Sequence, residues 1–480
     1  MATTYSGVRE LRPYTYNDLG GDSMRLAGNF EKKCLKSADR TFSQGLQCQQ
    51  INSISCVLSM SDSAFIIHSP QGCSGCVSGG ADGYRVGQAH RGVKLIKSPR
   101  VIVTNLDEND IIRGGEAKLR EAIRIAGERY DPKMIFIFTS CASGIIGDDV
   151  DAIAADAQTP DGPILIPIHC DGFRSKICAS GFDAAFIAIK KYLLPKEPRK
   201  KSSGLVNLFA PTSISYKDQL EIERLLALFG ATVNYIPFYS SYEKIQMITA
   251  AEASTSICKV FADEFMKELE ESYGIPFAHT VMPIGIRNTD KWLLGIAALL
   301  GKEAPAREYI EKEHKRVQPK LDEIKGRLEG KRVFICGGTG RSFAAAALID
   351  DFGMQLVGLE TPTYDFDAQI DIEYLNGIHK NYVVDVANMQ PFEQVNLVNH
   401  LKPDVFIGVP AWSARLGLPT THVLDPKRPT MGYDGIVYLG EKIAEQVENA
   451  GFNRKLAPYA RLPYKKSWYE QDAFKYIRDL

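Results

Sequence analysis

Residues 64–80, AFIIHSPQGCSGCVSGG, set the pattern from which the fold can be derived. The apolar run at 64–67 predicts a short buried strand that ends at His68, after which the chain becomes rich in glycine and serine and carries two cysteines. Glycine at the end of a strand permits a tight turn and close approach of the backbone. Cys73 and Cys76 are therefore placed to face a metal or another inorganic group.

The composition of the 480-residue chain is that of a globular protein with several domains. It is 45% hydrophobic and 24% charged with a formal net charge of -1, which gives no electrostatic case for nucleic acid or a membrane surface as partner. No apolar run approaches the ~20 residues of a membrane span, and the N-terminus lacks a signal-peptide core, so we expect a cytoplasmic protein. The ten cysteines are then expected to be reduced thiols, metal ligands or catalytic groups rather than disulfides.

Short apolar runs alternate with amphipathic stretches along most of the chain, which predicts parallel βαβ units. The first unit, expected over 47–200, has predicted strands at 64–67, 100–104, 133–138 and 163–168 and helices at 115–129 and 147–157. The second, 205–328, follows the charged linker 196–204 and has strands at 205–210 and 231–237 and helices at 216–228, 256–272 and 306–328. The third, 330–455, has strands at 331–336, 354–360 and 403–409 and a helix at 342–352.

We therefore expect an α/β protein of three doubly wound, Rossmann-like domains with parallel sheets. An extended or irregularly helical N-terminal arm, 1–46, and a C-terminal tail, 456–480, flank them. Ligands of such sheets bind outside the carboxyl ends of the strands.

The loop CGGTGR, residues 336–341, follows a predicted strand and opens a helix, as a phosphate-binding loop does. It lacks the GxGxxG spacing and the Lys-Ser/Thr pair of a P-loop. A tight turn facing a cleft is the simpler interpretation, and nucleotide binding is the alternative.

Three cysteines lie outside the apolar runs of the sequence. Cys73 and Cys141 follow the ends of predicted strands, and Cys48 lies in polar sequence. A structural cysteine is more often inside a strand, as Cys336 is in KRVFIC. The three positions indicate thiolate ligands of an iron–sulfur cluster, although the sequence has no tight CxxCxxC run and no paired CxxC zinc pattern. Cys73 and Cys76 alone have the spacing of a redox pair.

Cys258 stands at the start of the predicted helix 256–272. Free N–H groups and the helix dipole would stabilise a thiolate there. The alternative is a half-buried helix cysteine that only packs.

Together these segments resemble the α chain of nitrogenase component 1 and its relatives, from about residue 45 to 440. The matching segments are HSPQGC at 68–73, DENDIIRGGEAKL at 107–119, SCASGIIGDD at 140–149, CDGFRS at 170–175, Cys258 with its interval to YGIP at 273–276, the glycine pair at 337–338, and GYDG at 432–435. The set is specific because all of its members occur in the family's order.

The resemblance implies domains arranged around two buried metalloclusters. One is a relay cluster of the eight-iron, seven-sulfur P-cluster type, bound by Cys48, Cys73 and Cys141 at the interface with a β-type sister chain. The other is a large catalytic iron–sulfur cluster bound by Cys258. The resemblance also implies an α2β2 heterotetramer and an iron protein as electron donor, with MgATP bound by that partner only.

The glycine loop and its surroundings would complete the catalytic-cluster site. The N–H groups of Gly337, Gly338 and Gly340 are expected to hydrogen-bond cluster sulfides. Arg341 and Lys427 are candidates for the same role or for holding a bound organic acid, as is His422.

The sequence departs from the nitrogenase pattern around this cluster. Met431 stands where a histidine holds the far end of the cofactor, and a thioether is a soft, weak ligand. His422 is the nearest histidine that could replace it. The missing histidine favours an all-iron, precursor-like cluster over one capped by molybdenum or vanadium.

Further departures concern the residues that serve dinitrogen reduction. Cys178 and Phe182 occupy the positions of a glutamine and a histidine, and Ala81 lies near the position of an arginine. Gly340 aligns with a second arginine, although Arg341 is adjacent. Such a site is drier and poorer in proton donors, which suits an apolar organic molecule better than dinitrogen.

In these details the chain looks most like the catalytic chain of methylthio-alkane reductase, a nitrogenase-like enzyme that cleaves small thioethers to methanethiol and a hydrocarbon. A cofactor-assembly scaffold of the NifE type and a true nitrogenase α chain are the alternatives, and a nucleotide-dependent α/β enzyme without metal is a further one. Cys76 is either a supplementary ligand or a packed residue, and Cys56 has no assigned role.

Overall fold

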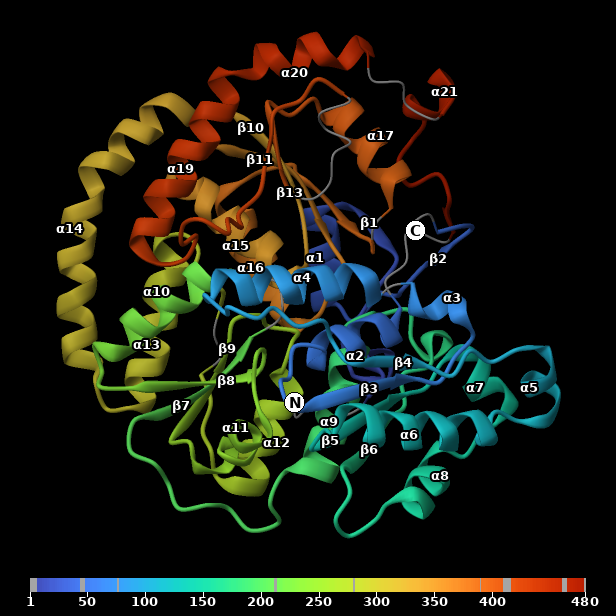
Figure 1. Cartoon of the computed structure of the whole chain (residues 1–480). Coiled ribbons are helices and arrows are strands. Elements are labelled where there is room, and N and C mark those ends of the chain that lie inside the picture. Colours follow the sequence, from blue (N-terminus) through green and yellow to red (C-terminus); the bar gives the residue numbers. More distant parts are fainter. Residues whose placement is uncertain are drawn as a thin grey trace.

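The computed structural model describes residues 7–43, 48–75, 77–210, 214–278, 281–388, 390–408, 416–459 and 464–478. Three sheets built mainly of parallel strands, each flanked by helices, form three α/β units that pack around a common centre (Figure 1). The predicted α/β class with parallel sheets is confirmed. Cys76 lies outside the described residues.

The first sheet has the strand order β4-β3-β5-β6 and is parallel throughout. Its strands are β3 (Ser63–Ile67), β4 (Val101–Val103), β5 (Met134–Phe138) and β6 (Ile164–Ile168). Helices α2 (Gln49–Val57) and α9 (Ser180–Leu193) cover one face, and α6 (Glu116–Tyr130) and α8 (Val150–Ala157) cover the other. Both faces are buried, which explains why β3 and β5 are continuous apolar runs.

Four shorter or more exposed helices follow strands or loops of this unit. They are α3 (Gln71–Ser74), α4 (Val77–His90), α5 (Glu108–Arg113) and α7 (Cys141–Ile146). In Figure 1, α4 crosses the middle of the molecule between the first and third units.

The second sheet has the order β8-β7-β9 and is also parallel. It consists of β7 (Leu205–Ala210), β8 (Thr232–Pro237) and β9 (Ala253–Ser256), with helices α10 (Tyr216–Ala227), α11 (Tyr242–Gln246) and α12 (Asp263–Tyr273). The prediction of one helix over 256–272 is wrong at its start. The small polar residues of β9 carry no strand signal of their own, and they are fully buried because they pair with β7.

The third sheet has the order β1-β12-β11-β10-β13-β14. Its strands are β1 (Leu19–Asp22), β10 (Arg332–Cys336), β11 (Gln355–Thr361), β12 (Val383–Val386), β13 (Val405–Gly408) and β14 (Thr420–Thr421). On one side lie α13 (Ile286–Leu299), α14 (Glu303–Leu328), α15 (Thr339–Asp351), α16 (Phe366–Ile378) and α19 (Gly432–Glu448). On the other side lies α17 (Pro391–Leu401).

Segments from the two terminal regions of the chain pack against this third unit. The segment expected to form an arm supplies β1, which pairs antiparallel with β12, and α1 (Ser23–Glu31), which contacts α16. β2 (Asp39–Arg40) pairs with β15 (Ile477–Arg478), and the short helices α20 (Ala450–Leu456) and α21 (Lys466–Tyr469) precede that strand. The described part of 1–46 is thus built into a sheet. Sequence analysis missed this strand because two of its four residues are glycines, and position 20 has to be glycine since a Cβ there would overlap the Phe474 ring.

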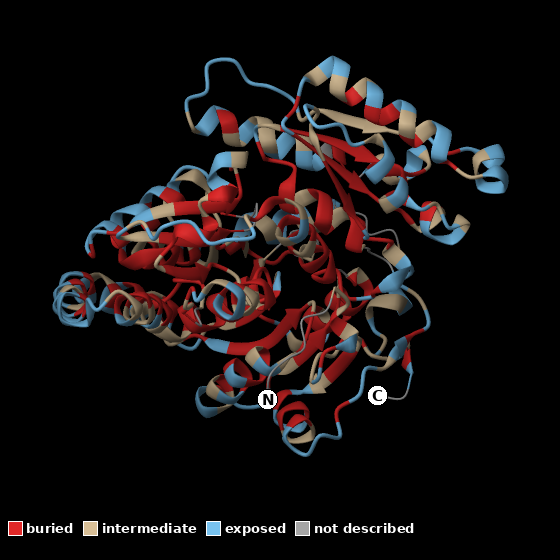
Figure 2. Cartoon of the chain, turned by 90° about the horizontal axis from the view of Figure 1, so that it is seen from below, coloured by how far each residue is buried: buried red, intermediate tan, exposed pale blue. Residues whose placement is uncertain are grey.

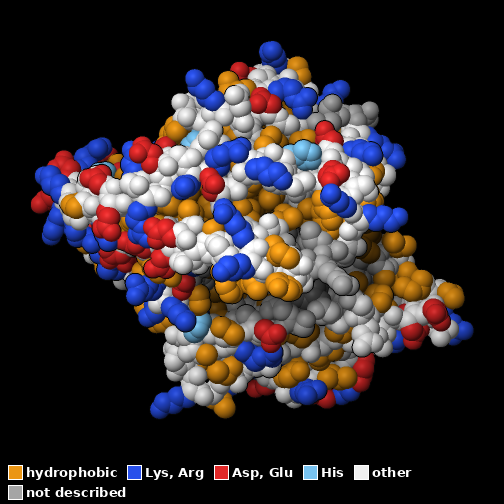
Figure 3. Space-filling view, turned by 90° about the horizontal axis from the view of Figure 1, so that it is seen from above, with side chains coloured by type: hydrophobic (Ala, Val, Ile, Leu, Met, Phe, Trp, Pro, Cys, Tyr) orange, Lys and Arg blue, Asp and Glu red, His pale blue; other side chains and the backbone are white. Residues whose placement is uncertain are grey.

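The burial pattern follows these layers. Strands and inward helix faces are buried, and the outer helix faces are exposed (Figure 2). Side chains of both charges crowd the flank formed by α14, on the left of Figure 3. Among the described residues, no helix is long and apolar enough to cross a membrane.

Candidate functional site

Three of the predicted thiols converge at the carboxyl edge of the first sheet. Cys48 caps the start of α2, Cys73 lies in α3 just after β3, and Cys141 begins α7 just after β5. Burial raises the pKa of Cys73, and the neighbouring thiols Cys141 and Cys48 raise it further. The structure therefore brings together the three cysteines that the sequence singled out.

A glycine makes room for this group of thiols. A Cβ atom placed on Gly172 would lie 3.1 Å from the Cβ of Cys48 and 3.3 Å from the Sγ of Cys141. Gly172 opens the 3-10 turn η2 (Gly172–Arg174), inside the CDGFRS segment. Sequence analysis did not single out Gly172, although that segment was part of the resemblance.

A buried hydrogen-bond network ties together the loops that carry the thiols. Asp148 accepts from His68 Nε2 at 2.8 Å and from the Gly115 N–H at 3.0 Å. The other His68 nitrogen contacts Thr104 Oγ1 at 3.1 Å. Burial lowers the pKa of His68 against the opposing effect of Asp148, so the ring is neutral near pH 7. The network joins three matching segments of the sequence around one edge of the sheet.

A fourth cysteine, Cys170, lies close to Cys48 but differs from the three. It is fully buried and donates through Sγ to the Thr139 carbonyl at 3.4 Å. Burial is the main cause that raises its pKa well above the usual range. Cys56 is likewise buried, and burial raises its pKa. Both behave as packed thiols.

Cys258 lies in the loop between β9 and α12, so the expectation that it opens a helix is wrong. α12 begins at Asp263, and its dipole does not act directly on the thiol. Burial raises the pKa of Cys258, while the N–H groups of Val260 and Gly340 act in the opposite direction. Ser256 Oγ holds the loop by donating to the Cys258 carbonyl at 2.8 Å.

The glycine loop of the third unit lies directly against Cys258. A Cβ atom on Gly340 would be 3.0 Å from the Cys258 Sγ. Gly338 is the N-cap of α15, and Gly337 accepts at its carbonyl from Ser342 Oγ at 2.9 Å. The chain thus approaches the thiol closely because position 340 has no side chain.

The first unit contributes an apolar wall to the same place. Phe182 packs edge-on against Phe261 with ring centroids 4.8 Å apart. Phe182 and Cys258 both pack against a small buried cluster that includes Val260. Cys178 is buried nearby in sequence, and burial raises its pKa. All three units therefore meet at Cys258.

Arg341 and His422 approach this site from the third unit. Burial lowers the pKa of Arg341, while Asp218 and Cys258 act against this effect, and its Nη1 donates to the Val423 carbonyl. Burial, followed by the charges of Arg341 and Lys442, lowers the pKa of His422 to about 4. His422 Nδ1 is buried without a hydrogen-bond partner, so the neutral ring retains a lone pair or proton to offer a ligand.

The two remaining candidates are placed differently. Met431 is fully buried in the largest hydrophobic core, where it caps α19. Lys427 is exposed, and its backbone N–H donates to Asp425 at 2.8 Å. The structure therefore does not group Lys427 with Cys258.

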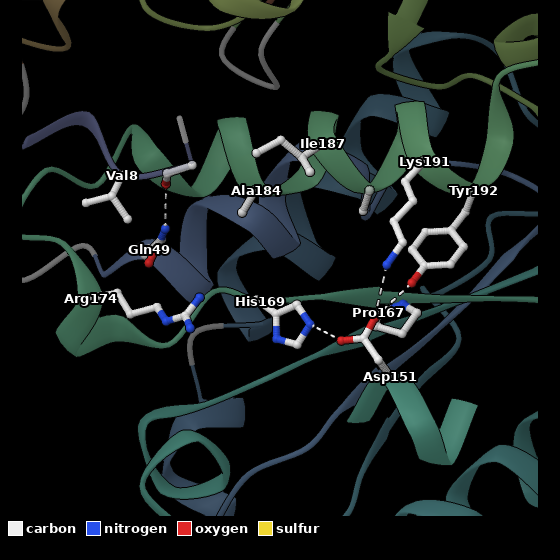
Figure 4. A pocket seen from close by; sticks show the side chains of 12 residues that line it. Val8, Gln49, Asp151, Pro167, His169, Arg174, Ala184, Ile187, Lys191 and Tyr192 are labelled. Carbon is white, nitrogen blue, oxygen red and sulfur yellow. Dashed lines mark hydrogen bonds and ion pairs between the residues drawn. The ribbon is translucent and has the colours of Figure 1, made fainter. Parts of the chain in front are cut away.

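Two pockets lie beside the thiol sites. One, of 260 Å³, is lined by Gln49, which follows Cys48, and at its other end by Asp151, which accepts from His169, Lys191 and Tyr192 (Figure 4). The other, of 730 Å³, is lined by Lys259 of the Cys258 loop and by residues of α12, α16 and the N-terminal segment. Among the described residues, no three His, Cys, Asp or Glu side chains are close enough to bind a single metal ion. The thiolates of an iron–sulfur cluster bind different irons, so this finding does not test a cluster.

Comparisons with known proteins agree on one family. Residues 48–448 match the family described as nitrogenase component 1 type oxidoreductase. The nitrogenase iron-molybdenum cofactor biosynthesis protein NifE of Clostridium pasteurianum is 29% identical over 364 residues, which cover 73% of this chain and 75% of that protein. The nitrogenase molybdenum-iron protein alpha chain of Methanococcus maripaludis is 24% identical over 401 residues, covering 81% and 83%.

A solved structure shows the same fold. Nitrogenase Cp1 at pH 5 superposes with a TM-score of 0.72 and 22% identity over 89% of this chain and 93% of that chain. The family match spans most of the chain, from Cys48 beyond the glycine loop to the end of α19. The chain belongs to the nitrogenase component 1 type oxidoreductase family.

Proposed function

We propose that this chain is the catalytic subunit of a nitrogenase-like reductase that cleaves the carbon–sulfur bond of small thioethers. The observation that carries the proposal is the apolar wall of Phe182 and Phe261 beside the thiol of Cys258. A small methylthio-alkane is mostly apolar, and its binding there would need few polar contacts.

The chain's own residues fit the two clusters that the resemblance implies. Three thiols converge around the space left by Gly172, and the Cys258 thiol meets the backbone of Gly340. When bound, the clusters would supply electron relay and a reducing iron centre. The protein would hold them through these thiols and keep the second site dry with aromatic side chains. N–H groups of the loop would stabilise negative charge there.

A sister chain would complete the first site. Three apolar side chains on α7, on η2 and on α5, which contacts α7, are exposed: Ile112 at 81%, Ile145 at 75% and Phe173 at 57%. Ile145 shares α7 with Cys141, and Phe173 follows Gly172. Exposed apolar side chains around a ligand site are typical of a protein–protein interface. We propose that a β-type chain docks here and that an iron protein delivers electrons to the assembled pair.

The second candidate function is a cofactor-assembly scaffold. The NifE proteins among the relatives favour it more directly than they favour the reductase. A scaffold would also need a thiol such as Cys258, but it would release its cluster to another protein. A nitrogenase α chain is a third candidate, which the apolar Phe182 and the buried Met431 disfavour.

The test is anaerobic turnover of the complex co-purified with its sister chain and combined with the iron protein and MgATP. We expect ethane or methane, with methanethiol, from a methylthio-alkane, and none of these from the matched Cys258→Ala complex. Loss of the cluster to an apo acceptor without hydrocarbon release would establish the scaffold instead. Ammonia formed from dinitrogen in proportion to electron flow would establish a nitrogenase. Metal analysis of the same sample identifies any molybdenum or vanadium.

A further inference from the structure

A row of buried polar side chains crosses the third sheet just before the glycine loop. Cys336 of β10 is in register with Glu360 of β11, which is in register with Asp385 of β12. In-register residues of neighbouring strands project from the same face. Their exposed fractions are 8%, 2% and 0%, so none of them meets bulk solvent.

Residues from two other segments cover this row. Glu393 of α17 is 4% exposed and receives two hydrogen bonds of 2.8 Å from Arg40 of β2. Arg40 also lies 3.5 Å from Asp385 and pairs with the partly exposed Asp18. Among the described contacts of Glu360, Asp385 and Glu393, Arg40 is the one cation. Three carboxylates cannot all ionise in a buried space that holds a single guanidinium.

The hydrogen bonds of this row show which buried oxygens lack a donor. Gln394 Nε2 donates to Glu360 Oε1 at 2.9 Å. The second oxygens of both side chains, Glu360 Oε2 and Gln394 Oε1, are buried without a hydrogen-bond partner, and so is Asp385 Oδ2 in the same row. Burial raises the pKa of Asp385 as well. Gln394 is 3% exposed. A proton on Glu360 Oε2 turns that oxygen into a donor, whereas a carboxylate would leave it a buried acceptor without a donor. Burial also raises the pKa of Glu360, as does the facing Glu393.

The row is joined directly to the Cys258 site. Gly337 follows Cys336, and Ser342 Oγ donates both to the Gly337 carbonyl and to the Glu360 carbonyl at 2.9 and 2.8 Å. Gly340, whose N–H faces Cys258, is four residues beyond Cys336, so at most ~14 Å of chain separates Cys336 from the glycine that contacts the thiol. Charge gained at one site is therefore felt at the other through a low-dielectric interior.

We propose that Glu360 is a proton-storing residue whose protonation is coupled to the charge at the Cys258 site. Extra negative charge at that site strengthens proton binding by Glu360, and the stored proton is available where a reduction consumes protons. Cleavage of a thioether, for example, takes up two electrons and two protons as one carbon–hydrogen and one sulfur–hydrogen bond replace the carbon–sulfur bond. The inference goes beyond the proposed function, because the coupling holds for a reductase or a scaffold that carries a cluster.

The test uses the cluster-loaded complex and a redox titration of the spectroscopic signal that Cys258→Ala abolishes. At low pH Glu360 is protonated in both redox states, so the midpoint potential should be constant. As the pH rises through the pKa of Glu360, the potential should fall, by at most 59 mV per pH unit. The Glu360→Gln complex should show no such break, and Glu311→Gln, an exposed glutamate on α14, should behave as the native protein.

A second measurement needs no cluster. Infrared difference spectra taken across the same pH range should show a carboxylic acid band that disappears as the pH rises and is missing from Glu360→Gln. Absence of this band in the native complex overturns the proposal. So does an identical break in potential in the native and Glu360→Gln complexes. If Glu360→Gln does not assemble, Glu393→Gln replaces it. Removing the facing carboxylate should move the break and the band to lower pH, and an unchanged position overturns the proposal.

Discussion

The close approach of the glycine loop to Cys258 can be tested by adding one methyl group. In Gly340→Ala, the new Cβ would lie 3.0 Å from the Cys258 Sγ and 3.4 Å from its Cα. Relaxed contacts between such atoms are about 3.5–4.0 Å, so the loop or the thiol must move by roughly 0.5 Å. Overpacking of this kind costs about 1–3 kcal/mol.

The substitution also has a favourable effect that must be subtracted. Gly340 lies in the first turn of α15, where alanine is better than glycine by about 0.5–1 kcal/mol. The net loss of unfolding free energy is therefore about 0–2.5 kcal/mol. Gly326→Ala in the exposed face of α14 is the matched control, because a Cβ there meets no atom within 4 Å. That variant should gain about 0.5–1 kcal/mol.

The decisive assay is the iron content and spectrum of the purified complex. A displaced thiol should lower the iron bound at the second site and leave the signal of the Cys48, Cys73 and Cys141 site unchanged. Urea unfolding of the two alanine variants supplies the stability difference. If Gly340→Ala is stabilised as much as Gly326→Ala and keeps its full iron content, the loop does not contact the thiol in the way described.

Three other substitutions test separate parts of the structure. Cys258→Ala should remove the iron of the second cluster and spare the first, and unchanged iron with both signals intact would show that Cys258 only packs. Burial raises the pKa of Asp351 to about 7, so the folded protein binds the Asp351 proton more tightly than the unfolded chain does. The free energy of unfolding is therefore highest at low pH and decreases as the pH rises towards 7. Asp351→Asn should therefore increase the unfolding free energy by up to about 4 kcal/mol near pH 8 and have little effect near pH 4, as measured by urea unfolding at both values. Asp148→Ala leaves His68 and the Gly115 N–H without their acceptor and should cost about 2–4 kcal/mol, whereas a loss below about 0.5 kcal/mol would contradict the role given to this network.

Most of the parallel strands could be predicted because strands buried on both faces consist mainly of apolar residues. β3, β5 and β10 are runs of large apolar residues that have both faces covered. The grouping of Cys73 and Cys141 followed from the same logic, since the carboxyl ends of neighbouring parallel strands share one edge, whereas Cys48 joined them through the resemblance. The resemblance then gave the right family, and the comparisons support its NifE and nitrogenase branches more directly than the reductase branch.

The rest could not be predicted because it depends on pairing between distant segments. β1 is Leu-Gly-Gly-Asp and β9 is Ala-Ser-Thr-Ser, and each becomes a strand only beside an existing one. The burial of Glu360 and Asp385 also depends on pairing between distant segments. In the sequence they resemble solvent-facing acids, and only the register of β11 and β12 shows that they lie side by side. Burial raises the pKa of Cys258, and the N–H groups that act in the opposite direction belong to Val260 and to Gly340 of another unit, so the helix dipole was the wrong cause to invoke.

The way in which the Cys258 loop is anchored bears on the choice between reductase and scaffold. Arg9 is 2% exposed, and its guanidinium donates to Asp183 of α9 at 3.0 Å, to Asp263 of α12 at 2.7 Å and to the Val260 carbonyl at 2.8 Å. The N-terminal segment thereby ties the residues that follow Cys258 to the first unit. Removing one partner from such a buried ion pair costs about 3–5 kcal/mol. Separating the Cys258 loop from Arg9 is therefore energetically unfavourable. A scaffold must let its cluster leave, whereas a reductase must keep its cluster through many turnovers. We propose that this buried anchor retains what the site binds, and such retention supports the proposed catalytic subunit over a scaffold.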